Sequence, residues 1–347
     1  MEILGIDVGF GFTKATNGDE FIIFKSLFGE ATEIQFRMSI GSVSFEENLH
    51  ITIDDQSYFI GEFAEQQSNV RQFTLHQERL LTEFAKIFAI TAAGSITEKY
   101  VPMNVVTGLP IGYYKQYHQQ FVKILSGHHQ IIFHQPDGSK VSRKININKV
   151  RMMPQPLGSI FNLLMDDNGK IVNTELGKQK VGVIDIGFRT TDFSIFDRLR
   201  YVERGSTTTD TGISRSFGFI SKKLREESGV SIEIYRLYKA VETGSIKIQG
   251  KEYDISNIRD QVFSHTARII ANDIERLWAE DWDIDTVVLT GGGSMALAKY
   301  LQPLIVGDVL PLKNDIDTRL NNVQGYFKYG KYEWEKHSSE SSPSPEE

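Results

Sequence analysis

Residues 1–14, MEILGIDVGFGFTK, predict the feature around which the fold is organised. A short apolar strand over residues 3–6 leads to Asp7, where a carboxylate can face solvent or a metal. A glycine-rich turn follows at once, because Gly9 and Gly11 lie directly after this strand. Such a turn lets the backbone approach a ligand closely and presents successive N–H groups to an anion.

The residues after the glycines favour phosphate as that anion. Thr13 supplies a hydroxyl and Lys14 a positive charge at a suitable reach, while Asp7 could anchor Mg²⁺ through its water ligands. For this stretch alone, an ordinary glycine hairpin turn after an edge strand is the alternative.

The same pattern returns at residues 181–196, VGVIDIGFRTTDFSIF. An apolar strand ends at Asp185, Gly187 follows two residues later, and Thr190 and Thr191 come next. Both turns lead into strand-like sequence, which disfavours a Rossmann site, where the glycines open a helix. The chain also contains no P-loop motif. Two such turns in a duplicated chain predict a phosphate chain held between two domains.

Composition limits the class of protein. The chain has 347 residues, enough for two domains, and 40% hydrophobic with 24% charged residues is ordinary for a globular protein. Its net charge of −7 argues against direct nucleic-acid binding, so any DNA partner would need an adaptor. The absence of cysteine excludes disulfides and thiolate zinc sites. With no leader-like start and no long apolar run, we expect a cytoplasmic protein without membrane contact.

Periodicity predicts the main elements. Residues 27–75 alternate as in a small β-rich insertion, and residues 258–278 have the strongest helical stripe, with Ser256 or Asn257 as its N-cap. The residues from Gly205 to Gly212 are rich in serine and threonine and lead into a basic helix. Further predicted helices span residues 78–92, 113–125 and 214–227, and further predicted strands span 104–107, 131–133, 145–147, 199–202 and 286–290.

Two further segments are candidates for function. Gln155 lies between two prolines in RMMPQPLGSIFNLL, residues 151–164, so its amide could position a hydrolytic water or simply cap the following helix. Three glycines, Gly291 to Gly293, stand between a strand and a helix that begins near Ser294. An ordinary turn needs fewer glycines, so we interpret them as the support of a flat ring beside a helix N-terminus. We expect no metal site at His128, His129 and His134.

Together these motifs resemble the actin, Hsp70 and sugar-kinase superfamily. D-x-G-x-G-x-T-K, the glutamine crossing, D-x-G-x-x-T-T-D and T-G-G-G occur in the order of its phosphate 1, connect 1, phosphate 2 and adenosine motifs. Within it the chain is most similar to ParM-type plasmid segregation ATPases, over nearly all of residues 1–330. The supporting segments are V-x-x-x-x-Q-P-x-G-S at 150–159, V-V-L-T-G-G-G at 287–293 and N-V-Q-G-Y at 322–326.

The resemblance implies an α/β fold with two actin-like (ribonuclease H-like) domains flanking a nucleotide cleft. Domain I would comprise residues 1–155 with a subdomain at 27–95 and a C-terminal return at 320–335. Domain II would comprise residues 156–319 with a subdomain at 214–255. The serine-rich, proline-rich and glutamate-rich residues 336–347 are expected to be a disordered tail.

The resemblance also implies roles for individual residues. Gln155 and Asp185 would be catalytic, and Asp7 and Asp185 would hold Mg²⁺ through water. Arg189 stands where many relatives have a small residue, so it could reach the γ phosphate or point to solvent. The nucleotide-binding residues would be Gly9, Phe10, Gly11, Phe12, Thr13, Lys14, Gly187, Phe188, Arg189, Thr190, Thr191, Gly212, Gly291, Gly292, Gly293 and Ser294.

Two functions follow from this resemblance. The first is a filament-forming ATPase that uses ATP or GTP with Mg²⁺, polymerises with itself and moves plasmid DNA through a DNA-binding adaptor. The alternative is a small-molecule, sugar-type kinase, for which Asp192 is the nominal catalytic carboxylate. The absence of a separate sugar-reading segment favours the filament-forming ATPase.

Overall fold

The computed structural model describes residues 2–34, 44–98, 100–310 and 317–340. The chain forms two compact units: unit 1 comprises Met1–Thr174 with Leu320–Glu347, and unit 2 comprises Glu175–Arg319. Both units combine helices with a sheet, which confirms the predicted α/β class. Among the described residues, no helix is long and apolar enough to span a membrane.

Unit 1 is built on one mixed sheet. β1 and β8 run parallel at its centre, β10 lies parallel to β8, and β2 and β3 continue the sheet from β1 as antiparallel strands. β1 is buried on both faces, which is why its sequence is a nearly continuous apolar run. In sheet order the strands are β3 (Phe21–Lys25), β2 (Phe12–Thr16), β1 (Glu2–Val8), β8 (Pro102–Leu109), β10 (Lys140–Pro154), β9 (Gly127–His134), β5 (His50–Ile53), β6 (Gln56–Ile60), β4 (Phe28–Glu30) and β7 (Arg71–Gln72).

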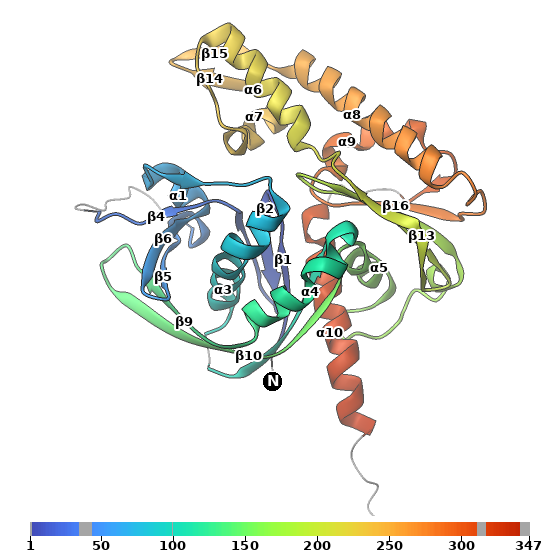
Figure 1. Cartoon of the computed structure of the whole chain (residues 1–347), viewed down its shortest axis with the longest axis horizontal. Helices are drawn as coiled ribbons and strands as arrows, with labels where there is room; N and C mark the ends of the chain where they lie inside the picture. The colour runs from blue at the N-terminus through green and yellow to red at the C-terminus, as the bar shows by residue number, and fades with distance from the viewer. Residues whose placement is uncertain (1, 35–43, 99, 311–316, 341–347) are drawn as a thin grey trace, which may run out of the picture. The chain divides into compact units, whose positions relative to one another are not determined.

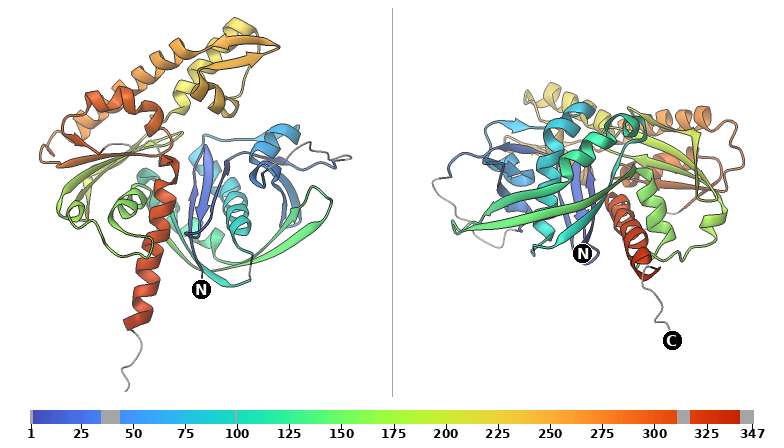
Figure 2. Two further views of the ribbon diagram at one scale, coloured as in Figure 1. Left: turned by 180° about the vertical axis from the view of Figure 1, so that it is seen from behind. Right: turned by 60° about the horizontal axis from the view of Figure 1, so that its bottom comes forward.

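The helix predicted at residues 78–92 is longer in the structure and is interrupted by a π-helical turn. It begins as α2 (Gln77–Arg79), passes through a π-helical turn η2 (Leu80–Phe84), and continues as α3 (Ala85–Ile96). α3 is buried almost all round and not on one stripe, because it lies against the sheet and against α4. β9 and β10 extend the sheet as a long hairpin, green in Figure 1 and Figure 2. The other helices of unit 1 are η1 (Glu46–Asn48), α1 (Gly61–Gln67), α4 (Ile111–Leu125), α5 (Pro156–Leu164) and α10 (Asn321–Glu340).

A close crossing of α5 and α10 fixes the boundary of unit 1. A Cβ atom added at Gly325 would lie 1.6 Å from the Gly158 carbonyl oxygen, so the two backbones touch. Beside the crossing, the buried Asn322 Oδ1 accepts hydrogen bonds from the Ser159 N–H (3.1 Å) and hydroxyl (2.7 Å). α5 therefore belongs to unit 1, and the boundary lies after Thr174 instead of after residue 155.

The tail predicted to be disordered begins too early in the sequence analysis, because α10 extends into it. The helix continues to Glu340, so residues 336–340 are helical where we expected disorder. The remaining residues of that predicted tail, 341–347, lie outside the described part of the chain.

Unit 2 repeats the same strand pattern in a smaller sheet. β11 pairs antiparallel with β12 and parallel with β16, as β1 pairs with β2 and β8. β13 is longer than predicted, because the threonine-rich stretch up to Thr209 pairs with β12 and does not form a loop. In sheet order the strands are β13 (Arg200–Thr209), β12 (Thr191–Asp197), β11 (Lys180–Ile186), β16 (Thr286–Thr290) and β17 (Asp308–Val309).

Helices and one hairpin complete unit 2. α8 (Ser256–Leu277) packs on α6 and α9, and its apolar residues join those of the sheet in one core. The predicted caps, Ser256 and Asn257, lie inside this helix, and Asp254 Oδ1 instead accepts the Ser256 N–H at 2.8 Å. The other elements are η3 (Leu176–Lys178), α6 (Ser214–Ser228), η4 (Ile234–Arg236), α7 (Tyr238–Thr243), β14 (Ser245–Ile248), β15 (Lys251–Asp254), α9 (Ser294–Leu301), η5 (Gln302–Leu304) and η6 (Thr318–Leu320).

The crossing of α5 and α10 can be tested with two glycine-to-alanine variants. Gly325→Ala forces two backbones apart and should lower the free energy of unfolding by about 1–3 kcal/mol, as overpacking of a tight contact does. Gly218→Ala is the control, because a Cβ there meets no atom within 4 Å in helix α6. It should stabilise the protein by up to about 1 kcal/mol. Urea unfolding monitored by circular dichroism measures both, and equal effects would contradict the close crossing.

Candidate functional site

The first glycine turn joins β1 to β2 and is closed by its own backbone. The Gly9 N–H donates to the Phe12 carbonyl oxygen at 3.1 Å, and Asp7 lies opposite Lys14 in the antiparallel pair. A Cβ at Gly9 would lie 3.0 Å from that Phe12 oxygen, so the tightness of the turn accounts for this glycine. The turn thus follows immediately after the end of a buried strand.

The Asp7 carboxylate is the electrostatic centre of this turn. Asp7 is only 4% exposed, and the Lys14 ammonium forms an ion pair with the Asp7 Oδ2 atom at 2.8 Å. The Gln155 side-chain amide donates to its Oδ1 at 3.2 Å. Burying a carboxylate is costly unless it is paired and hydrogen-bonded, and both conditions hold here. The structure therefore brings together three side chains that the sequence selected separately.

Gln155 is held by its backbone at the start of α5. Its N–H donates to the Leu109 carbonyl oxygen at 2.9 Å, and its own carbonyl accepts from the Tyr326 hydroxyl at 3.4 Å. Its side chain makes no capping hydrogen bond to α5, which removes the alternative that it only caps this helix. The amide is instead fixed beside the Asp7 carboxylate.

Two predicted residues of the first turn face the protein interior. Thr13 is fully buried, and its hydroxyl lies 3.0 Å from the Ser26 hydroxyl, which donates to the Gly9 carbonyl at 2.6 Å. Phe10 is also buried. Thr13 and Ser26 thus support the turn from behind. Ser26 follows a different strand, β3, and belongs to no motif, so no sequence pattern pointed to it.

The second turn has the same geometry as the first. The Gly187 N–H donates to the Thr190 carbonyl oxygen at 2.9 Å, and Asp185, 5% exposed, lies opposite Asp192. The position of Lys14 in the first turn is therefore occupied by a carboxylate in the second. That carboxylate is buried and accepts a hydrogen bond from the Thr208 hydroxyl.

A loop packs on the back of the second turn. The Thr191 hydroxyl donates to the Thr211 carbonyl oxygen at 2.7 Å, and the Gly212 N–H donates to the Arg189 carbonyl oxygen at 3.0 Å. A Cβ at Gly212 would lie 2.3 Å from the Arg189 carbonyl carbon. Contact with the turn is sufficient to require a glycine here, and the expected role of Gly212 in nucleotide binding stays a prediction.

Arg189 and Phe188 occupy opposite environments. The Arg189 guanidinium pairs with the Asp210 carboxylate at 3.0 Å and keeps 28% of its side-chain exposure. Phe188 instead turns toward the core, where its ring lies 5.5 Å from that of Phe217 and 5.3 Å from that of Tyr238. Asp210 is thus a partner that the sequence analysis did not identify.

The triple-glycine turn lies directly on the end of β11. Gly291 has φ +84°, and a Cβ there would lie 2.2 Å from Asp185 Oδ1. The Gly293 N–H donates to the Ile186 carbonyl at 2.8 Å, and the Ser294 hydroxyl donates to the Gly291 carbonyl at 2.7 Å. These contacts bring the adenosine-type motif and the second carboxylate together within unit 2.

Gly292, in contrast, is exposed. A Cβ at this position would lie 3.2 Å from Cγ of Arg319, whose guanidinium pairs with Asp317 at 2.6 Å. Arg319 is a second residue that sequence reasoning missed, because it is distant in the chain from the glycines.

The carboxylates fit a metal that is held through its water ligands. Within the described ranges, no group of three or more histidine, aspartate or glutamate side chains could bind an ion directly. Each turn offers one buried carboxylate, Asp7 or Asp185, next to backbone N–H groups. Oxygen donors combined with retained waters suit Mg²⁺.

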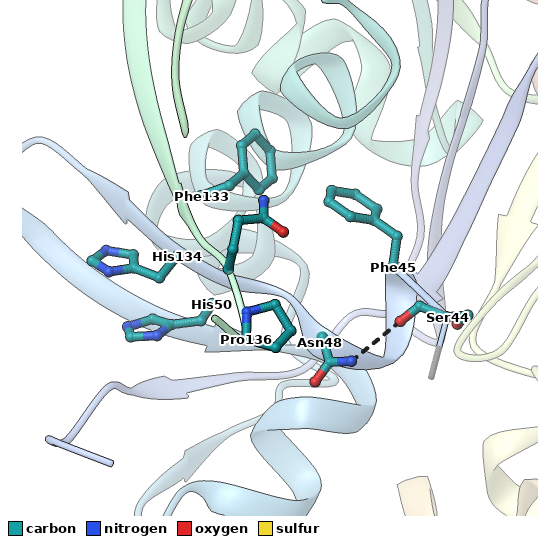
Figure 3. Close-up of a pocket in the computed structure, with 8 residues that line it drawn as sticks. Ser44, Phe45, Asn48, His50, Phe133, His134 and Pro136 are labelled. Carbon is teal, nitrogen blue, oxygen red and sulfur yellow. Dashed lines mark hydrogen bonds between the residues drawn. The ribbon is translucent and has the colours of Figure 1, made fainter. Parts of the chain in front are cut away.

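A separate cavity of about 220 Å³ lies in unit 1, where Figure 3 shows the residues around it. The His50 and His134 rings stack with centroids 4.0 Å apart, and His134 Nε2 lies 2.8 Å from the Thr52 hydroxyl. His128 and His129 contact the Tyr100 hydroxyl and the Leu125 carbonyl instead. The cavity is lined by Ser44, Phe45, Asn48, His50, Phe133, His134, Gln135 and Pro136.

Sequence comparison matches the chain to two family models. Residues 5–158 match the N-terminal domain of actin-like proteins, and residues 183–303 match the C-terminal domain of the archaeal, MreB-like actin homologues. Comparison with curated protein sequences gives no match.

Solved structures match over nearly the whole chain. A non-polymerisable quadruple mutant of pCBH ParM aligns with a TM-score of 0.81 and 24% identity, and a 15-stranded ParM filament from Clostridium botulinum with 0.81 and 22%. The archaeal actin homologue Ta0583 in complex with ADP aligns with 0.78 and 20%. Each alignment covers 95% of this chain and 99% of the other. At these identities the likeness concerns the fold alone.

The contact between the triple-glycine turn and Asp185 can be tested within one turn. Gly291→Ala introduces a Cβ at positive φ and against the carboxylate, so it should lower the free energy of unfolding by about 2–4 kcal/mol. In Gly292→Ala the new Cβ contacts only the flexible stem of Arg319, so the free energy of unfolding should change by less than about 1 kcal/mol. Thermal unfolding of the two variants measures the difference, and a Gly292→Ala effect as large as that of Gly291→Ala would contradict the arrangement.

Proposed function

Because this chain is an actin-like protein, we propose that it binds and hydrolyses ATP with Mg²⁺ and assembles into filaments that depend on the bound nucleotide. The observation that carries the proposal is the repeated turn. In both units a buried aspartate precedes a glycine whose N–H closes the turn onto the residue three positions later. The ADP complex of Ta0583 and the ParM filament support nucleotide binding and assembly by this fold.

The first turn would bind the β and γ phosphates. Gly9 and Gly11 allow close approach, Phe12 belongs to the same turn, and Lys14 supplies positive charge from a fixed position beside Asp7. Thr13 would act indirectly, since its hydroxyl is buried against Ser26. The second turn would contact the same phosphate chain through Gly187 and Thr190, with Arg189 at its edge.

Asp7 and Asp185 would hold Mg²⁺ through water. The bound ion would neutralise phosphate charge that develops during hydrolysis. The protein's own contribution would be to fix both carboxylates. Lys14 and Gln155 bind that of Asp7, and the Gly291 turn packs closely against that of Asp185.

Gln155 would orient the attacking water. Its backbone is anchored on both sides, and its amide lies at hydrogen-bond distance from Asp7, so little motion is needed to place a water there. The carbonyl oxygen of the same side-chain amide can accept a hydrogen bond from that water.

The triple-glycine turn would lie along the adenosine. Gly292 is the exposed member, so a base would contact this residue while Gly291, Gly293 and Ser294 keep the turn on β11. The partly buried side chain of Arg319 beside Gly292 would form a second wall for the base. GTP could be accepted by the same backbone contacts.

For the biological role, we propose plasmid DNA segregation through a DNA-binding adaptor, in line with the ParM-like fold. The alternative, a small-molecule kinase, requires a free catalytic carboxylate. Asp192, its nominal candidate, is 2% exposed and hydrogen-bonded to Thr208, which favours the ATPase.

Gln155→Ala tests the role of the amide. If Gln155 orients water, hydrolysis should slow about ten- to a thousandfold while ATP affinity stays nearly unchanged, since only a positioning group is lost. Steady-state phosphate release and equilibrium binding of a fluorescent ATP analogue measure the two effects. Equal losses of binding and hydrolysis would mean that Gln155 is structural.

Assembly is tested by light scattering and pelleting of the purified protein. With ATP and Mg²⁺, or a slowly hydrolysed analogue, scattering should rise above a threshold protein concentration, because a head-to-tail contact propagates as an open filament. ADP should give less polymer if the nucleotide selects the assembling conformation. A protein that hydrolyses ATP, stays monomeric at all concentrations and phosphorylates a small molecule would favour the kinase.

A further inference from the structure

One edge of the sheet in unit 2 exposes large apolar side chains. β11, β16 and β17 run parallel, and the glycine turns follow the ends of the first two. The starts of these strands form the opposite edge, where Trp282 is 88% exposed and Val306 is 94% exposed. We call the segments 280–285 and 304–307 at this edge the tryptophan edge.

Trp282 is held on a rigid support. The preceding Asp281 has a fully buried carboxylate that accepts two hydrogen bonds from Arg204, at 2.7 and 3.0 Å. Lys180 forms an ion pair with the same carboxylate at 2.9 Å. The Asp281 N–H donates to the Trp278 carbonyl oxygen at 2.9 Å, and the indole of Trp278 is itself buried. The exposure of Trp282 is therefore built into the fold.

A pre-organised, exposed tryptophan is suited to binding a protein surface. Tryptophan is enriched among the residues that dominate binding energy, and rigid presentation lowers the entropy lost on association. Glu280, Asp283 and Asp285 are exposed around it. Together with Asp281 they outnumber Lys180 and Arg204, the cations that pair with them, so the edge is net acidic and its partner should offer an apolar contact flanked by positive charge.

Such a surface is present on α6 of the same unit. Phe219 is 58% exposed, and Arg215, Lys222 and Lys223 are exposed on the same helix at neighbouring positions. Lys223 also pairs with the Glu227 carboxylate at 3.3 Å, which leaves Arg215 and Lys222 as the cations nearest to Phe219 without an ion pair to that glutamate. A Cβ at Gly218 would meet no atom within 4 Å, so an incoming ring would find space beside Phe219. We call this surface the α6 basic face.

These two surfaces are too far apart to meet within one unit. α6 packs on the middle of α8 through Ser216 and Thr266, whereas the tryptophan edge follows the last turn of α8. Figure 1 shows α6 beside the start of α8, with β14 and β15, and the segment after α8 at the other end of that helix. α8 has 22 residues, which corresponds to a length of about 33 Å.

We propose that the tryptophan edge of one copy of this chain docks on the α6 basic face of a second copy. The inference rests on the proposed assembly and specifies its contact. Because the two surfaces differ, the contact is heterologous, and each added copy leaves one surface free at either end. The acidic residues around Trp282 face the basic residues around Phe219, so high salt should weaken the contact.

The test uses two variants that each remove one surface. Trp282→Ala removes the aromatic anchor of the edge, and Phe219→Glu places negative charge in the basic face. Each variant alone, with a slowly hydrolysed ATP analogue, should need at least about tenfold more protein to assemble than the wild type, as loss of a central anchor implies. An equimolar mixture should form a 1:1 dimer in analytical ultracentrifugation, because one working edge and one working face remain.

Controls separate this contact from folding and from assembly itself. Val172→Ala, which shortens a side chain that is 62% exposed in unit 1, should assemble like the wild type. All three variants should bind the fluorescent ATP analogue with wild-type affinity. Suppose that the wild type assembles. If Trp282→Ala or Phe219→Glu then assembles at the same concentration, or if their mixture stays monomeric, the docking contact is refuted while the proposed filament is not. A variant that loses nucleotide binding would also refute it, and a wild type that never assembles would refute both.

Discussion

The structure of unit 1 depends on one buried charge, the Asp7 carboxylate between Lys14 and Gln155. Lys14 lies on the neighbouring strand, β2, and Gln155 is the residue directly before α5. α5 in turn is fixed by its backbone contact with α10. Removing water from a carboxylate is costly, so all three elements must hold their positions for the charge to be tolerated. The same constraint places the Gln155 amide beside the first glycine turn.

Unit 2 carries the same turn in different side-chain surroundings. Its turn has the same backbone hydrogen bond, but the position equivalent to Lys14 is Asp192, which is satisfied by Thr208. Asp185 is instead approached closely by the Gly291 backbone. The duplicated turn has therefore kept its backbone geometry while its side-chain surroundings have diverged. In the proposed function, unit 1 would supply the cation and the water-positioning amide, and unit 2 the wall for the base.

Sequence reasoning succeeded where the signal is local. The strand, aspartate and glycine pattern identified β1 and β11, and the helix after Gly293 begins at the predicted Ser294. It failed where the outcome depends on distant partners. Ser26 and Arg319 approach the glycine turns from other segments. Burial around α3, the strand pairing of β13 up to Thr209 and the helical residues 336–340 likewise depend on packing or length that no local pattern specifies.

The proposed function requires that both buried aspartates serve one nucleotide–metal complex. The decisive measurement is a double-mutant cycle of Asp7→Asn and Asp185→Asn, with ATP affinity determined at fixed Mg²⁺. Each single variant should weaken binding at least about tenfold, and the double variant should lose less than the product of the two, because the groups share one ligand. Unchanged affinity in both single variants, or strictly independent losses, would contradict the account.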